Sequence, residues 1–254
     1  MRRFTRAALA LALVAGLAYV STGHADEDAA AAFREANALF ASGDYEAAAG
    51  RFASVLDQGR FSTALLYDLA NAESKRGDVG AAVLGYERAL SLAPRDPDVL
   101  ANLRQTRAAA NLTAPVRDRW QSAAAFLTVD GWSWLAAAAL WLACLLVGAY
   151  ALRADAERRV PRVLVGLVTA LTIFIAITAS LARTRLAELD RAVVVGAGAT
   201  LRVAPFEAST SSTEVVAGDL VDVERAHEGF FLVRTSEGQA GWMPREHLER
   251  ILPR

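Results

Sequence analysis

Two stretches of this 254-residue chain decide its fold: residues 43–56, GDYEAAAGRFASVL, and residues 77–90, GDVGAAVLGYERAL. Gly-Asp opens both, and an alanine, an aromatic ring and a leucine return at a constant offset of 34 residues. The glycine suits the left-handed turn that ends a preceding helix. The small alanine lets two helices approach closely, and the ring of Phe52 or Tyr86 fills the space between them. We therefore expect helical pairs that recur along residues 30–110.

A period of 34 residues with two helices in each unit is the signature of the tetratricopeptide repeat. Pro94 closes the second unit where the pattern expects a proline, whereas the first unit has Arg60 at the equivalent position. A further helix, with Val99 and Leu103 at helical spacing, would cover the exposed face of the last repeat. We therefore predict a tetratricopeptide repeat domain over residues 26–111, made of two units and a capping helix.

The first helices of such repeats line a concave face, on which side chains 34 residues apart share one position. Amides occupy one such position and aromatic rings flank it, so the candidate protein-binding groove consists of Phe33, Asn37, Phe40, Tyr67, Asn71 and Gln105. Because an amide both donates and accepts hydrogen bonds, a ladder of amides could hold the backbone of an extended peptide. The alternative is that these polar residues are merely tolerated on a solvated face. The lysine pairs of a chaperone-type carboxylate clamp are absent from the sequence of these helices.

The N-terminal residues have the three parts of a secretory signal peptide. A cluster of arginines precedes an uncharged apolar run over residues 7–20, and Gly23 and Ala25 then occupy the −3 and −1 positions of a cleavage site. We predict that residues 1–25 are a signal peptide. The alternative is an uncleaved anchor helix, which the short apolar run disfavours because a span needs about 20 residues.

Two long uncharged segments, residues 131–152 and 163–182, are predicted to be transmembrane helices. At ~1.5 Å per residue, each is long enough for a hydrocarbon core of ~30 Å. Trp132, Trp134 and Tyr150 lie near the ends of the first segment, where aromatic side chains prefer the membrane interface. A buried helical hairpin in a soluble protein is the alternative. Linkers are expected over residues 112–130 and 183–191.

The loop between the two segments, residues 153–162, contains Arg153, Arg158, Arg159 and Arg162. The positive-inside rule places such a short basic loop in the cytoplasm. The repeat domain and the C-terminus would then both face the periplasm, from an anchor in a bacterial inner membrane. Neither segment contains a charged residue or a histidine, so the spans offer no side chains for a proton or ion path.

From about Ala192 the pattern changes to short alternating strands separated by Gly and Ser turns, which is typical of a small barrel. This stretch resembles the bacterial SH3 family. The resemblance lies in Leu201-Arg202 before Pro205, in Ala217-Gly218-Asp219, and in Glu237-Gly238-Gln239-Ala240-Gly241-Trp242. The family usually has a tryptophan at the start of the strand that here begins with Phe230-Phe231. We predict a bacterial SH3-like domain over residues 192–254.

The order of the parts resembles the BatE family of the Bacteroides aerotolerance operon. Signal peptide, tetratricopeptide units, two spans with a short basic loop and a C-terminal SH3 module follow one another in that order. The resemblance implies a non-enzymatic membrane protein. It also implies partners, because relatives of the operon encode membrane proteins with von Willebrand factor A domains and a MoxR-type ATPase.

The residues themselves favour a binding protein over an enzyme. No nucleophile–base pair stands out, and a single Cys144 with three scattered histidines argues against a metal site, so neither a cofactor nor a metal is expected. Both outward modules contain more acidic than basic residues, so nucleic acid is not an expected partner.

We therefore predict a scaffold or adaptor in a membrane complex related to stress or aerotolerance. Its expected partners are other membrane or periplasmic proteins, with von Willebrand factor A domain proteins among them, and the lipid bilayer. Three alternatives remain open: a peptidoglycan-binding module of the cell envelope, an assembly factor for a periplasmic complex, and an enzyme accessory whose chemistry the sequence hides.

Overall fold

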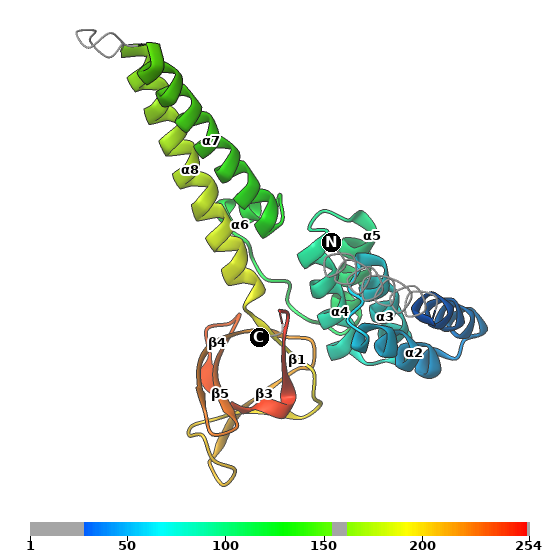
Figure 1. The fold of residues 1–254 in the computed structure, drawn as a ribbon. Coiled ribbons are helices and arrows are strands. Elements are labelled where there is room, and N and C mark those ends of the chain that lie inside the picture. The colour runs from blue at the N-terminus through cyan, green and yellow to red at the C-terminus, as the bar shows by residue number, and fades with distance from the viewer. Residues whose placement is uncertain (1–27, 154–161, 253–254) are drawn as a thin grey trace, which may run out of the picture. The chain divides into compact units, whose positions relative to one another are not determined.

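The computed structural model describes residues 28–153 and 162–252 of the chain (Figure 1). It divides into two compact units, Met1–Asp78 and Val79–Arg254. The predicted signal peptide, residues 1–25, and most of the predicted cytoplasmic loop lie outside the described residues.

The first unit is helical, with a helix over residues 28–42 followed by α2 (Tyr45–Asp57) and α3 (Thr63–Arg76). Local capping explains these bounds. Gly43 has φ +86° and so makes the left-handed turn that the sequence predicts, and the Asp44 carboxylate then accepts a hydrogen bond from the Ala47 backbone N–H at 3.1 Å.

The core of the first unit is built mainly from alanines, which lets its helices lie close together. Phe52 is completely buried at the centre of this core. The buried members are Ala29, Ala32, Ala36, Ala48, Ala49, Phe52, Val55, Leu65 and Ala72. The expectation that small residues and one aromatic ring fill the interhelical space therefore agrees with the packing of this unit.

The second unit begins with α4 (Val79–Leu92) and α5 (Pro97–Ala109). Asp96 caps α5 by accepting hydrogen bonds from the Asp98 and Val99 backbone N–H groups, and Pro97 occupies the first turn, where its missing N–H is not needed. A short helix, α6 (Arg119–Ala124), follows inside the segment that was expected to be a linker, residues 112–130. Its capping box, formed by Asp118 and Gln121, was not predicted.

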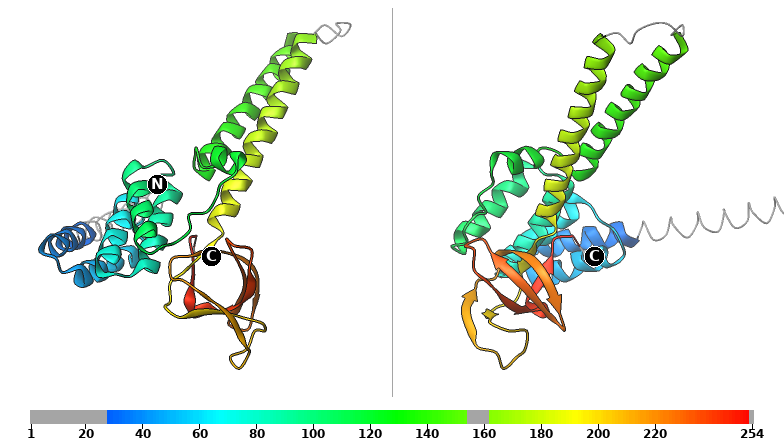
Figure 2. Two further views of the ribbon diagram at one scale, coloured as in Figure 1. Left: turned by 180° about the vertical axis from the view of Figure 1, so that it is seen from behind. Right: turned by 90° about the vertical axis from the view of Figure 1, so that its left-hand side faces the viewer.

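Two long apolar helices, α7 (Val129–Arg153) and α8 (Arg162–Leu189), pack against each other as a hairpin (Figure 2). Both are long and apolar enough to cross a bilayer, and only 6% of each apolar window is buried inside the protein. That low burial disfavours the alternative of a soluble core hairpin. The segment expected as a second linker, residues 183–191, differs from its prediction, because α8 continues through it to Leu189.

The C-terminal residues form an antiparallel sheet that curves into a half-barrel (Figure 1). The order of its strands in the described residues is β3-β2-β6-β5-β4-β1-β7. A 3₁₀ turn, Arg245–His247, leads into the last strand. The strands are β1 (Ala192–Val194), β2 (Ala199–Arg202), β3 (Ser211–Val215), β4 (Leu220–His227), β5 (Phe230–Thr235), β6 (Ala240–Pro244) and β7 (Leu248–Arg250).

The tightest hairpin of the sheet joins β4 to β5 through Glu228 and Gly229 alone. Both residues have positive φ, +39° and +87°, as a two-residue type I′ turn requires. The inner face is lined by alternating apolar side chains, including Val221, Val233 and Met243. The prediction that the C-terminal module consists of β-strands is confirmed.

Candidate functional site

Five of the six predicted groove residues lie in the first unit. Phe33 is half-buried and packs edge-to-face on Phe52, with ring centroids 5.7 Å apart, and Phe40 does the same on Tyr45 at 5.2 Å. Part of each ring therefore belongs to the internal packing of the unit, and only the remainder is free to contact a partner.

The three predicted amides differ in exposure. Asn37 is exposed, whereas Asn71 is half-buried on α3, as is Tyr67 one turn earlier. Gln105 is exposed on α5, which belongs to the second unit. A peptide-binding ladder of these amides stays a prediction.

In the second unit, the contacts converge on α4, which sequence analysis treated only as the second helix of a repeat. Most of its side chains are buried, including Glu87. The Glu87 carboxylate is paired with the guanidinium of Arg107 on α5 at 2.7 Å, and both side chains are buried. Removal of either partner would leave an uncompensated buried charge, which typically costs about 3–5 kcal/mol.

The first turn of α4 lies directly against strand β1. A Cβ atom placed on Gly80 would meet the Val194 carbonyl oxygen and the Val195 Cα atom, both at 2.8 Å. Strand β1 cannot yield easily, because the same Val194 oxygen accepts a hydrogen bond from the Gly218 backbone N–H at 2.7 Å. Only glycine therefore fits at position 80 without a shift of the backbone.

The middle of α4 holds the C-terminal end of the chain through Arg88. Its Nε atom donates to the Ile251 carbonyl at 3.1 Å, and its Nη2 atom donates to the Arg250 carbonyl at 3.0 Å. The same Nη2 atom forms an ion pair with Glu249 on β7 at 2.8 Å. One arginine thus satisfies main-chain carbonyls at the end of the edge strand β7.

The end of α4 meets α8 through Arg185, whose side chain is only 3% exposed. Its Nη2 atom donates to the Leu90 carbonyl at 2.8 Å, in the last turn of α4. A cation at the carboxyl end of a helix also interacts favourably with the helix dipole. Glu188 balances the charge at 3.0 Å and in turn contacts Arg117 at 3.3 Å. Arg185 falls in the expected linker, residues 183–191, so the sequence analysis missed this role.

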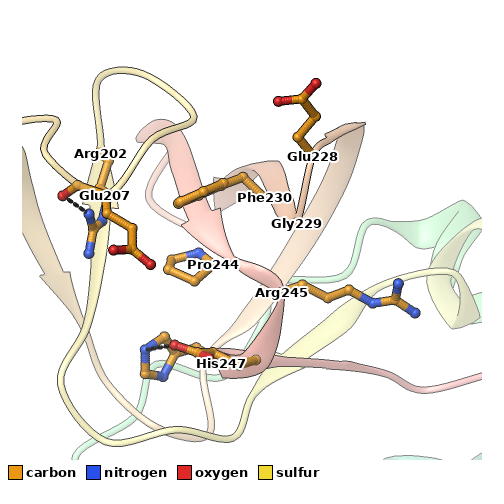
Figure 3. A pocket seen from close by; sticks show the side chains of 9 residues that line it. Arg202, Glu207, Glu228, Gly229, Phe230, Pro244, Arg245 and His247 are labelled. Carbon is orange, nitrogen blue, oxygen red and sulfur yellow. Dashed lines mark hydrogen bonds and ion pairs between the residues drawn. The ribbon is translucent and has the colours of Figure 1, made fainter.

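The half-barrel carries an open groove of about 610 Å³ (Figure 3). Pro244 lies between Phe230 and His247 in that view, with Arg202 and Glu207 to one side, while the Arg245 side chain extends away from them. The lining is therefore a small apolar floor with charged groups of both signs around it. Its residues are Arg202, Glu207, Glu228, Gly229, Phe230, Pro244, Arg245, Glu246 and His247.

The Arg202 side chain is held in this groove by the loop that follows β2. Its Nη1 atom donates to the Glu207 backbone carbonyl, while its Nε atom is buried without a hydrogen-bond partner in the part of the chain that the structure describes. The guanidinium also lies 6.0 Å from the centre of the Phe230 ring. Phe230 therefore supplies an aromatic ring to the groove.

A smaller hollow of about 130 Å³ lies beside strand β3 and is lined by three carboxylates, those of Glu214, Asp219 and Glu237. Burial raises the pKa of Asp219, a hydrogen bond with the Val216 backbone lowers it, the charge of Glu237 raises it and that of Arg107 lowers it. Within the described residues, no group of three or more His, Cys, Asp or Glu side chains is arranged to hold a metal ion.

No protein-family model, curated protein or solved structure matches this chain.

Proposed function

We propose that this protein is a membrane-anchored scaffold of the bacterial cell envelope, which holds protein-binding surfaces next to the bilayer without catalysing a reaction. In this proposal the helical part consists of tetratricopeptide repeats, the half-barrel is a bacterial SH3-like module, and α7 with α8 anchors the chain in the inner membrane. Both modules face the periplasm. The resemblance to the BatE family supports this arrangement and suggests membrane proteins with von Willebrand factor A domains as partners.

The observation that carries the proposal is the convergence of three parts of the second unit on α4. Gly80 packs against strand β1, Arg88 binds the carbonyls at the end of β7, and the Leu90 carbonyl accepts a hydrogen bond from Arg185 of α8. Because these contacts all lie along one helix, from its first turn to its last, the half-barrel is held in a defined position near the end of an apolar helix. Such an arrangement suits a protein that presents binding surfaces at a fixed distance from a membrane.

The proposal includes two binding surfaces. The first is the face of the first unit with Asn37, Tyr67 and Asn71, whose amides suit a peptide backbone. The second is the groove around Phe230 and Arg202, where an aromatic ring and a guanidinium suit a peptide side chain and a carboxylate. Two weak contacts on one anchor bind a partner more tightly than either contact alone, because the second contact forms at a high effective concentration.

Co-purification of the tagged full-length protein from its own cells in a mild detergent, followed by mass spectrometry, tests the proposal. We expect integral membrane proteins to be recovered, and Tyr67→Ala combined with Asn71→Ala to reduce their yield. Gln58→Ala is a matched control on an exposed residue after α2. Unchanged recovery with the double variant, at an equal level of membrane-inserted protein, would refute the role of the first surface.

Binding of peptidoglycan is the second candidate function, and the groove of the half-barrel favours it. Its lining combines cations with carboxylates around Pro244 and Phe230, and peptidoglycan stem peptides also contain charges of both signs. Pull-down of the full-length protein with purified sacculi, compared with the Phe230→Ala variant, tests this function. Retention on sacculi that depends on Phe230, without recovery of protein partners, would replace the scaffold proposal.

A further inference from the structure

The segment between α5 and α7 exposes large apolar side chains just before the first apolar helix. Val116 is 94% exposed, Trp120 is 42% exposed and Phe126 is 54% exposed. Each square ångström of apolar surface left in water costs roughly 25 cal/mol, so three such side chains within eleven residues favour burial in an apolar medium.

This segment is fixed to the base of the α7–α8 hairpin (Figure 2). Helix α6 packs against α8, and the indole N–H of Trp132 on α7 donates to the Ala124 carbonyl at 2.9 Å. Trp120 and Phe126 therefore lie on a structured element with a fixed depth relative to the two apolar helices.

The lengths of the helices place this element at the edge of the bilayer. A span of ~30 Å needs about 20 helical residues, and α8 has 28 residues. The residues of α8 beyond the length of a span lie at its C-terminal end, because Arg185 and Glu188 there are buried within the protein. The edge of the hydrocarbon region then falls near Ala182 on α8 and near Gly131 on α7, which is the level at which α6 packs.

The side chains of the segment match the chemistry of the headgroup region. Trp rings are favoured at the membrane interface, and Phe is common on the apolar face of helices that lie in it. The Arg95 guanidinium lies 4.2 Å from the centre of the Phe126 ring, so this ring already has a cation on one face. Residues 116–126 contain Arg117, Asp118 and Arg119 as charged residues. Arg117 is paired with Glu188 at 3.3 Å, and Asp118 offsets the exposed Arg119, so the segment has little net charge. The interaction is therefore expected to depend on the rings and not on anionic lipid.

We propose that residues 116–126 form a membrane-surface anchor, in which Trp120 and Phe126 insert into the headgroup region of the bilayer. The anchor rests on the proposed insertion of α7 and α8, and it adds a second kind of membrane contact to the two spans. It fixes the tilt of the second unit relative to the membrane plane.

Site-specific fluorescence in full-length protein tests this anchor. Ala123 is exposed and lies one turn after Trp120, so a fluorophore on Ala123→Cys in a Cys144→Ser background reports the depth of α6 without removing either ring. Ser236→Cys in the same background, in the exposed turn between β5 and β6, is the matched control. The proteins are reconstituted into phosphatidylcholine nanodiscs that contain a lipid with a nitroxide on its headgroup.

We expect the nitroxide lipid to quench the fluorophore at position 123 several-fold more than at position 236, with the same result when phosphatidylglycerol is added. Trp120→Ala with Phe126→Ala should reduce quenching at position 123 to the level of the control. Equal quenching at positions 123 and 236, or quenching at 123 only with phosphatidylglycerol, would overturn the anchor.

The natural Cys144 separates failure of the anchor from failure of insertion. This cysteine is exposed on α7, within the proposed span, so a fluorophore attached there is shielded from a water-soluble quencher only if the hairpin is inserted. Shielding at Cys144 with no quenching at position 123 refutes the anchor alone. Accessibility of Cys144 to the aqueous quencher refutes the membrane insertion on which the proposed function also depends.

Discussion

Replacement of Gly80 by alanine is the sharpest test of the contact between α4 and strand β1. The added methyl group would lie 2.8 Å from the Val194 carbonyl oxygen and 2.8 Å from the Val195 Cα atom. Ordinary contacts between carbon atoms are about 3.5–4.0 Å, so the two elements must separate by roughly 0.7 Å or more. Both atoms belong to the main chain, so no side-chain rotation relieves the overlap.

The expected cost follows from two opposing effects. Overpacking of this kind costs about 1–3 kcal/mol, whereas alanine in place of glycine favours a helix by up to about 1 kcal/mol. The net loss of about 1–2 kcal/mol corresponds to an increase of roughly 5- to 30-fold in the population of the opened contact.

Hydrogen exchange measured by mass spectrometry detects this opening in the full-length protein. The informative amide is that of Gly218, because it donates to the same Val194 oxygen that the new methyl group displaces. We expect exchange at Gly218 to accelerate in Gly80→Ala by the factor given above.

Gly50→Ala is the matched control, since Gly50 lies inside α2 and a Cβ atom there has no neighbour within 4 Å. That substitution should stabilise its helix by about 0.5–1 kcal/mol and leave Gly218 unchanged. If Gly80→Ala also left exchange at Gly218 unchanged, α4 and β1 would not be in contact, and the convergence of contacts on α4 would lose its strongest support.

Three further predictions concern charged side chains of the second unit. Arg185→Leu should destabilise the unit by up to about 3 kcal/mol in urea unfolding, because it leaves the buried Glu188 with only the more distant Arg117 as a cation. The double variant Arg185→Leu with Glu188→Leu should lose clearly less; equal losses would contradict the pairing. Burial raises the pKa of the Asp219 carboxyl in the folded state, so its ionisation at neutral pH destabilises the fold. Stability is therefore lost as pH rises from the unfolded-state pKa of ~3.9 through the folded-state pKa. Asp219→Asn should therefore have a higher Tm than the wild type at pH 7 and the same Tm below about pH 4, and a constant difference at both values would refute this cause. Arg88→Ala should weaken the attachment of the chain end by about 1–2 kcal/mol through loss of its bond to the Ile251 carbonyl, which carboxypeptidase digestion detects as faster trimming; trimming at the wild-type rate would show that other contacts hold this end.

Helices and strands that have a local signal could be predicted from the amino-acid sequence. The glycine and aspartate at positions 43 and 44 end one helix and start the next, and Asp96 followed by Pro97 starts α5. The uncharged runs of α7 and α8 predicted both long helices, because length and apolar composition suffice for that inference. Alternation of apolar side chains after Ala192 predicted the strands of the sheet. Each of these signals lies within one continuous stretch of sequence, so no tertiary information was needed.

The packing roles of Arg185, Gly80 and the groove residues could be recognised only in the folded protein. Arg185 follows an apolar run and was expected in a linker, yet it lies inside α8, and its partner, the Leu90 carbonyl, is 95 residues away in the chain. Gly80 has no special backbone angle that a sequence pattern could reveal, and its role comes from strand β1, which approaches it from a distant segment. The groove of the half-barrel likewise combines Arg202 with Phe230 and His247, which only the folding of the sheet brings together. The effect of a charged residue or a glycine on stability depends on the atoms that contact it. For these residues the contacting atoms come from distant parts of the chain, so only the fold brings them together.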